Sequence, residues 1–198
     1  MWALKWIAST LVGMVLGVVS ALWMAGQTQI TPPISFQDVE VEGWHSDWTI
    51  GSEAADLYTR AWVARHGLLA LTKREAVYFV RATDDDGQPL KEACDYRVSG
   101  GDFPAEWWSI TIYDRDSRLP MNDGWALSVD KTDIGDKGDW TVLVSSAAMA
   151  DGTQFISSKN AGVFDLTLRL YRPSAALIEN PASNLVPPSI ETVSCGGG

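Results

Sequence analysis

Two cysteines carry the most reactive side chains of this sequence. Cys94 and Cys195 are its only cysteines, and an N-terminal export signal would bring both into an oxidising compartment, where disulfides form and persist. We therefore predict a disulfide between Cys94 and Cys195 that pins the C-terminal tail across the expected β-sandwich. A buried free thiol with a loose tail is the alternative.

The two histidines lack the pattern of a metal centre or a hydrolase. His45 lies between tryptophans, and His66 falls within a predicted helix beside Arg65. A zinc site needs several converging His, Cys or carboxylate ligands at characteristic spacing, and a Ser-His-Asp hydrolase needs a G-x-S-x-G turn that the sequence lacks. We predict no metal and no cofactor here.

Two acidic loops could bind calcium through carboxylate oxygens. One is Asp84-Asp85-Asp86, and the other holds Asp133, Asp136 and Asp139 around glycines. Neither matches an EF-hand, and acidic residues in turns are usually solvated, so turns are the favoured interpretation of both loops.

Arg169 is the charged side chain that the strand pattern singles out. It alternates with leucines, so it points away from the core, and we expect it to pair with a carboxylate on a neighbouring strand. Two carboxylates at the right separation could hydrolyse glycosides, but a sequence does not supply that separation. The sequence identifies no catalytic residues and favours a protein that is not an enzyme.

These side chains must be positioned by strands, and two stretches predict them best. In 107–114, Trp108, Ile110 and Ile112 form one face, opposite Trp107, Ser109, Thr111 and Tyr113. In 164–171, Phe164, Leu166, Leu168 and Leu170 form an apolar face, opposite Asp165, Thr167 and Arg169. Two such strands, far apart in sequence, could close a sandwich around one core.

Further strands are expected around these two, with one soluble helix. Alternation predicts strands near 77–83, 94–98, 125–129, 140–144 and 154–157, and a weak one at 36–41. Ser52 is a good N-cap for a helix over 52–72, whose Leu57, Ala61, Ala64, Leu68 and Leu71 form one apolar stripe. The pattern predicts a mainly β, jelly-roll-like sandwich with one adjoining α-helix.

The N-terminus predicts a membrane anchor. The twenty residues from Trp6 to Ala25 include no charged side chain. A helix of this length can cross roughly 30 Å of hydrocarbon. Lys5 precedes it, and the positive-inside rule then gives a cytoplasmic N-terminus and a periplasmic domain in the bacterial inner membrane. A cleaved signal peptide is the alternative, although Trp23 is bulky for a site ending at Ala25. We expect an anchor over 1–26, a linker and approach loop over 27–50 and a soluble domain over 51–198.

A ladder of small residues runs along this segment. Ser9, Gly13, Gly17, Ala21 and Ala25 recur at every fourth position, so they share one helix face, where another transmembrane helix can approach closely. We expect association with itself or with a partner subunit. Composition alone is the alternative, because eight of the twenty residues from Trp6 to Ala25 are Gly, Ala, Ser or Thr.

The overall composition excludes one class of partner. The formal net charge is −10, and such an acidic chain repels phosphate backbones, so we expect no nucleic-acid binding. Ten tryptophans are many for 198 residues. They are more typical of an aromatic β core than of sugar stacking.

Several segments together resemble the bacterial family catalogued as domain of unknown function 1214. Taken in this order, they are Tyr58–Ala61, Gly67–Leu71, Glu75–Phe79, Trp107–Asp114 and Leu166–Pro173. The resemblance covers roughly Gly51 to Pro173 and implies a jelly-roll-like β domain with an adjoining helix and no assigned reaction. Longer members carry another domain ahead of it, where this chain has its apolar segment, and no family site residues carry over.

Three functions are therefore open. The favoured one is a membrane-tethered binding or accessory module of the cell envelope without catalysis. The second is a carbohydrate-binding or carbohydrate-processing protein that uses exposed Trp44, Trp48 or Trp125 in a cleft beside a carboxylate. The third is a structural subunit of a membrane complex.

Overall fold

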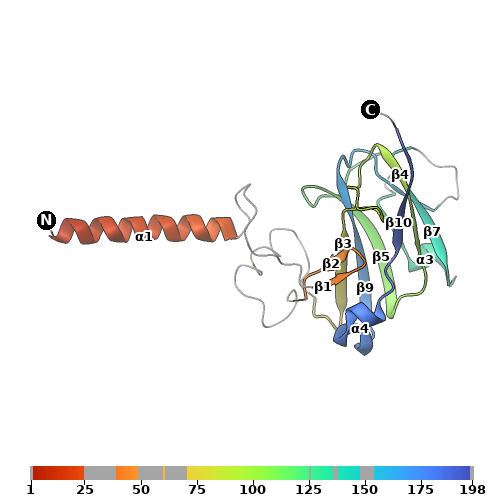
Figure 1. Ribbon diagram of the computed structural model, residues 1–198, viewed down its shortest axis with the longest axis horizontal. Helices are drawn as coiled ribbons and strands as arrows, with labels where there is room; N and C mark the ends of the chain where they lie inside the picture. Colours follow the sequence, from red (N-terminus) through yellow and green to blue (C-terminus); the bar gives the residue numbers. More distant parts are fainter. Residues whose placement is uncertain are drawn as a thin grey trace. The chain divides into compact units, whose positions relative to one another are not determined.

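The computed structural model describes residues 2–24, 39–48, 60, 71–124, 126–135, 138–147 and 154–196. These residues belong to two units. In one unit, the helix α1 (Trp2–Met24) is the long red coil of Figure 1. Residues 5–23 of α1 are long and apolar enough to cross a membrane, as the sequence predicts.

The other unit is a β-sandwich of two sheets (Figure 1). The larger sheet has the order β1 (Val39–Val41), β2 (Trp44–Ser46), β3 (Ala76–Arg81), β9 (Phe164–Pro173), β5 (Ala105–Asp114) and β6 (Ser128–Asp130). The smaller sheet has the order β10 (Ser189–Cys195), β4 (Cys94–Gly100), β7 (Trp140–Ser145) and β8 (Phe155–Ser157). Neighbouring strands are antiparallel except β7 and β8. Short helices follow β6 and β9: α3 (Lys131–Ile134), α4 (Ala175–Glu179) and α5 (Pro181–Asn184).

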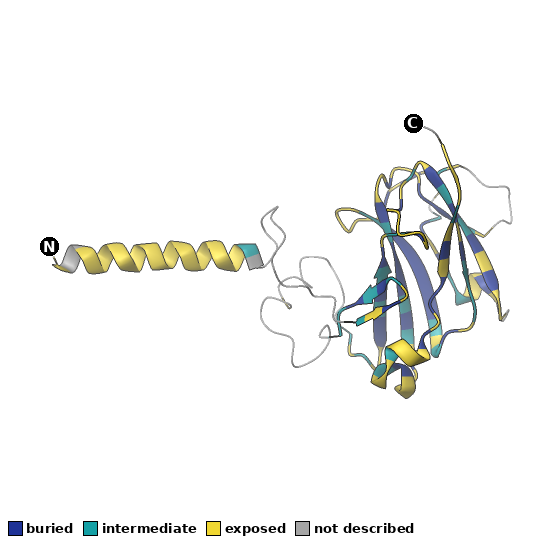
Figure 2. Cartoon of the chain, viewed as in Figure 1, coloured by how far each residue is buried: buried dark blue, intermediate teal, exposed yellow. Residues whose placement is uncertain are grey.

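The core lies between the sheets, and the predicted apolar faces line it. Ile110, Ile112, Leu166, Leu168 and Leu170 are each 0% exposed, and Figure 2 shows buried residues along the strands of both sheets. The apolar faces of 107–114 and 164–171 are thus confirmed, and the mainly β fold with them.

The two strands that the sequence singles out lie side by side in one sheet, and they do not face each other across the core. β5 and β9 are antiparallel neighbours in one sheet, paired from Ala105–Pro173 to Asp114–Phe164. The smaller sheet supplies the opposing face, where the Trp140 ring stacks on Trp108 with centroids 4.9 Å apart. Long-range pairing of two strands with similar patterns is not readable from periodicity, because both arrangements bury the same residues.

Some of the other predicted elements differ from the structure, and some lie outside the described residues. The strands near 77–83 and 94–98 lie in different sheets, so the turn between them connects the two layers and does not close a hairpin. The proline-containing tail is ordered, and it ends in the edge strand β10. The weak strand expected over 36–41 is confirmed in its second half, which forms β1, while 36–38 lie outside the described residues. Apart from Arg60, Leu71 and Thr72, the helix expected over 52–72 also lies outside them, as does the expected linker over 27–35.

Candidate functional site

The outer side of the larger sheet gathers aromatic and polar side chains from its three central strands. Register places Tyr78 of β3 opposite Arg169 of β9, and Trp107 of β5 opposite Tyr171 of β9. Alternation points these side chains away from the core, because their neighbours Phe79, Leu168 and Trp108 are buried. We call the set of Tyr78, Trp107, Tyr113, Arg169 and Tyr171 the Arg169 face.

The Arg169 face has large side chains above a floor of small ones. All five of its members are partly exposed. Between them, Ser109, Thr111 and Thr167 are 7%, 9% and 6% exposed. These three short side chains are buried although alternation points them away from the core. The tryptophan, tyrosines and arginine of the face are residue types that are enriched at protein contact surfaces.

Arg169 is held in place by hydroxyl groups. Its Nη1 donates to Thr111 Oγ1 at 2.8 Å, its Nη2 donates to the Tyr113 hydroxyl, and its Cζ lies 5.3 Å from the centroid of the Tyr113 ring. The expected cross-strand ion pair is wrong for this residue, since no carboxylate of the described residues lies within ion-pair distance of its guanidinium. The guanidinium is fixed in direction while its charge is not directly neutralised.

The outer side of the smaller sheet offers a contrast. There Arg97 Nη1 pairs with Glu191 Oε2 at 2.8 Å across β4 and β10, as expected for cross-strand charges. Ser99 and Thr141 hydrogen-bond to each other at 3.1 Å. This is an ordinary solvated sheet face with its charges satisfied internally.

Two rings form one end of the Arg169 face. Trp107 and Tyr171 meet edge to face with centroids 5.1 Å apart. The indole Nε1 of Trp107 donates to Thr132 Oγ1 of α3 at 3.4 Å. Such contacts fix the rings in position, so a partner would meet apolar surface that is already ordered.

Asp165 lies beside this face, directly opposite Tyr113. The pKa of Asp165 is raised to about 6, mainly by burial and also by the nearby Asp114, while the Thr167 hydroxyl and Arg169 act in the opposite direction. Thr167 Oγ1 donates to Asp165 Oδ1 at 3.3 Å. The charge of Asp165, which lies beside the Arg169 face, therefore changes near pH 6.

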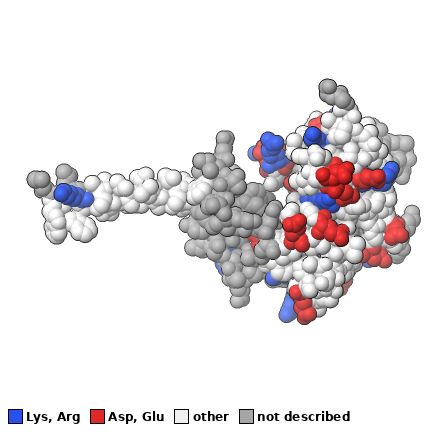
Figure 3. Space-filling view, in the orientation of Figure 1, with Lys and Arg blue, Asp and Glu red and all other residues white. Residues whose placement is uncertain are grey.

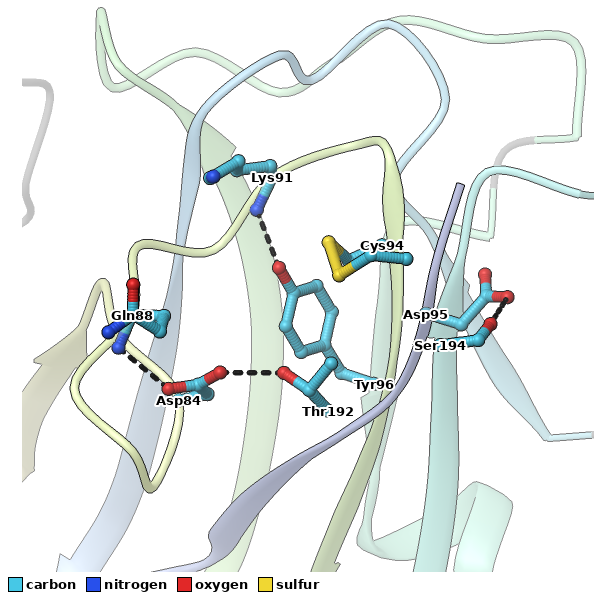
Figure 4. Close-up of a disulfide and its surroundings, with 9 residues drawn as sticks. Asp84, Gln88, Lys91, Cys94, Asp95, Tyr96, Thr192 and Ser194 are labelled. Carbon is cyan, nitrogen blue, oxygen red and sulfur yellow. Dashed lines mark hydrogen bonds between the residues drawn. A yellow bond between two sulfur atoms is a disulfide. The ribbon is translucent and has the colours of Figure 1, made fainter. Parts of the chain in front are cut away.

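The acidic loop at Asp84 to Asp86 serves the fold. The Asp84 carboxylate accepts bonds from the backbone N–H of Gln88 at 2.7 Å and from the Thr192 hydroxyl at 2.6 Å (Figure 4). Burial alone would raise the pKa of Asp84, but these hydrogen bonds and one from Asp86 lower it overall. The Asp85 carboxylate pairs with Arg81 Nη2 at 2.9 Å and accepts the N–H of Ile190 in β10. The loop thus covers the free edge of β10.

Among the described residues, no group of three or more His, Cys, Asp or Glu side chains could hold a metal ion. Asp133 instead belongs to a capping box at the start of α3, where its Oδ2 accepts the N–H of the N-cap residue Asp130. Asp139 is exposed, and Asp136 lies outside the described residues. His45 Nδ1 lies 4.0 Å from Glu40 Oε2 on the outer side of β2, and His66 lies outside the described residues.

The structure contains the disulfide between Cys94 and Cys195, with Cα atoms 4.0 Å apart. The cysteines face each other on the adjacent strands β4 and β10. Around them, Tyr96 accepts the N–H of Lys91 at 2.8 Å, and Ser194 donates to Asp95 at 3.0 Å (Figure 4). The bridge fastens the last strand to its own sheet and does not cross the sandwich.

The remaining predicted residues are distributed as follows. On α1, Ser9, Gly13, Gly17 and Ala21 are exposed, and Ala25 lies outside the described residues. Trp44 is 0% exposed and donates to the Pro188 carbonyl from the core, so it cannot line a sugar cleft. Trp48 is partly buried against the core, and Trp125 lies outside the described residues.

Sequence reasoning identified the polar sides of both strands but not the site they form together. The alternation of 107–114 and 164–171 already placed Trp107, Tyr113 and Arg169 outward. Only the adjacency of β5 and β9 brings them onto one surface, and only the pairing of β3 with β9 adds Tyr78.

Comparison with known proteins gives a family and a fold. Residues 75–175 match the family model described as "Protein of unknown function (DUF1214)". That range holds β3, β5 and β9 and hence every member of the Arg169 face. No curated protein matches the sequence.

Two solved structures are similar. The VPA0106 protein from Vibrio parahaemolyticus has 23% identity and a TM-score of 0.55, with 71% of this chain and 36% of that chain covered. A putative uncharacterized protein from Burkholderia cenocepacia has 13% identity and a TM-score of 0.44, with 60% and 30% covered. The chain thus spans about a third of the length of the Vibrio protein, and this likeness supports the fold alone.

Proposed function

Since the chain belongs to the DUF1214 family of proteins of unknown function, we propose its function from its own surface: it is a membrane-tethered binding or accessory module of the bacterial cell envelope. The Arg169 face is its binding surface. No reaction forms part of this proposal.

The tether is supported by α1. The segment Lys5–Trp23 of α1 has 19 residues and is apolar enough to span a membrane. Lys5 is the only charged residue of the helix. With the cytoplasmic N-terminus that Lys5 favours, the sandwich lies in the periplasm of a cell with an inner membrane. The disulfide between Cys94 and Cys195 agrees with an oxidising compartment.

The composition of the Arg169 face is the observation that carries the binding role. Tryptophan, tyrosine and arginine are the residue types that contribute most binding energy at protein interfaces, whereas lysine and glutamate are depleted there. The Arg169 face consists of Trp107, three tyrosines and Arg169 on the outer side of the larger sheet. This set of residue types fits a protein partner better than a small substrate.

The small residues of α1 support a second contact within the membrane. Ser9, Gly13, Gly17 and Ala21 lie four residues apart and are exposed. In lipid, such faces let helix backbones approach closely and associate, with a copy of the same helix or with another subunit. A module that binds through its sandwich and its anchor could serve as an accessory subunit of a membrane complex.

Co-purification tests the binding role. The full chain is isolated from native membranes in mild detergent as wild type and as a Trp107→Ala/Tyr171→Ala double variant, and associated proteins are quantified by mass spectrometry. A Ser99→Ala/Thr141→Ala variant truncates a matched cross-strand pair on the smaller sheet. We expect partners to be lost from the first variant and kept by the second, with both variants folded by thermal melting. Equal recovery in all three would reject the Arg169 face as the binding surface.

A further inference from the structure

We infer that Arg169 receives a carboxylate from the partner: a protein that docks on the Arg169 face places one acidic side chain, or its C-terminal carboxylate, on this guanidinium. The inference rests on the proposed binding role and specifies the chemistry of the partner at one atom group.

The first support for this inference is a comparison of the arginines that lie in strands. The described strands contain four arginines. Three of them pair with carboxylates: Arg81 with Asp85 at 2.9 Å, Arg97 with Glu191 at 2.8 Å and Arg172 with Glu106 at 3.1 Å. Among these four, Arg169 is the one without a carboxylate in ion-pair distance, although it lies on the central strand of the larger sheet. The chain therefore satisfies its strand arginines with its own carboxylates except at this position.

The geometry around Arg169 is prepared for a planar anion. Thr111 and Tyr113 take one N–H each from the two terminal nitrogens, and a guanidinium has five N–H donors. The Nε of Arg169 has no hydrogen-bond partner among the described residues and is not one of the buried polar atoms that lack a partner, so this nitrogen is accessible and can donate to a ligand. Because the fork is already held, little side-chain entropy is lost when a carboxylate binds to it.

The charge of the whole chain limits the form of the anion. The chain carries a net charge of −10, and Figure 3 shows acidic side chains spread over the one side of the sandwich that it draws. An acidic stretch would be repelled, whereas a single carboxylate flanked by apolar groups fits Arg169 and the rings of Tyr78 and Tyr171. Desolvated charge pairs surrounded by aromatic contacts are typical of interface centres.

Zero-length crosslinking tests this inference. In an Arg169→Lys variant, carbodiimide treatment of native membranes converts a carboxylate next to the introduced amine into an amide, with release of the urea. An Arg97→Lys variant is the internal standard, because Glu191 of the same chain lies beside that position. We expect an amide from position 169 to an Asp, a Glu or a C-terminus of another protein, and an intrachain amide to Glu191 from position 97. In the Arg169→Gln variant, recovery of that protein by co-purification should fall about tenfold or more.

The other outcomes overturn the inference in distinguishable ways. An amide from position 169 to Asp165 or Asp114 of the same chain would show that the carboxylate is internal. No adduct at position 169, with the Glu191 standard formed and partner recovery normal, would reject the carboxylate but leave the binding role standing. An adduct with a mass that is not a peptide would reject a protein partner. Failure of co-purification from the wild type would remove the binding role and this inference with it.

Discussion

At the scale of single residues, the environment of each side chain decides its chemistry more than its type does. Arg81 and Arg97 are neutralised within the fold, and Arg169 is oriented by hydroxyl groups. Hydrogen bonds lower the pKa of Asp84, whereas burial and the nearby Asp114 raise the pKa of Asp165. None of these differences is visible in the sequence, where all five are charged residues in or beside strands.

Asp165 gives a pH prediction. Its pKa in the folded protein is about 6, above the ordinary value of 3.8, so the folded state binds this proton more tightly than the unfolded state does. The contribution to stability is complete below 3.8 and is lost as the pH rises through about 6. The charged groups that act on it are Asp114 and Arg169. An Asp165→Asn variant should therefore raise the free energy of unfolding by about 1–3 kcal/mol at pH 8 and have little effect at pH 4. Urea denaturation at both pH values measures this, and a gain at pH 4 as large as at pH 8 would contradict it.

Gly100 gives a packing prediction. A Cβ at this position would lie 2.5 Å from Cζ2 of the buried Trp140 ring, which cannot move without disturbing Trp108 and Phe103. A Gly100→Ala variant should destabilise the domain by about 1–3 kcal/mol. Gly138 is the control, since a Cβ there meets nothing within 4 Å. Thermal unfolding would show both effects, and equal melting temperatures for the two variants would refute the packing account.

At the scale of elements, the sequence predicts what packs against the core but not which elements are neighbours. The alternating leucines of β9 and isoleucines of β5 predict their strands. The sequence of β10 has no such alternation, because Ile190 is its one buried residue and most of its other side chains are exposed. This strand is held by backbone pairing with β4, by the Asp84 to Asp86 loop and by the disulfide, all of which depend on distant partners.

The disulfide should therefore matter to β10 and to the whole domain. Its cysteines are 101 residues apart, and closing a loop of that size contributes up to ~4.7 kcal/mol in the chain-entropy model, with ~2–4 more typical of measurements. A Cys94→Ser/Cys195→Ser variant should lose stability in that range, with early loss of amide protection in 189–195. Hydrogen exchange and urea denaturation test this, and wild-type stability in the double variant would contradict it.

The anchor helix makes a prediction of its own. Replacing Gly13 and Gly17 together with leucine fills the ladder of small side chains without reducing the apolar character of α1. Insertion should persist, while crosslinking between helices in the membrane should disappear. Crosslinking that is unchanged in this variant, or absent from the parent, would show that the ladder reflects composition only.

At the scale of the whole molecule, an aromatic surface on a sandwich is joined in one chain to a helix that is long and apolar enough to cross a membrane. The family and the mainly β fold could be inferred from the sequence, because alternation and a set of ordered segments carry that information. For the Arg169 face, only the outward side chains of the separate strands could be inferred. Its members come from three strands whose order depends on long-range pairing. The function proposed here depends on that assembled surface.

Site-specific photo-crosslinking in native membranes tests the surface most directly. A photoreactive amino acid is placed singly at Tyr78, at Tyr113 or, as controls on the smaller sheet, at Ser99 or Thr141. We expect the same partner protein to be crosslinked from Tyr78 and Tyr113 and not from Ser99 or Thr141. Crosslinks of equal yield from both sheets, or from the smaller sheet alone, would contradict the assignment of the Arg169 face as the binding surface.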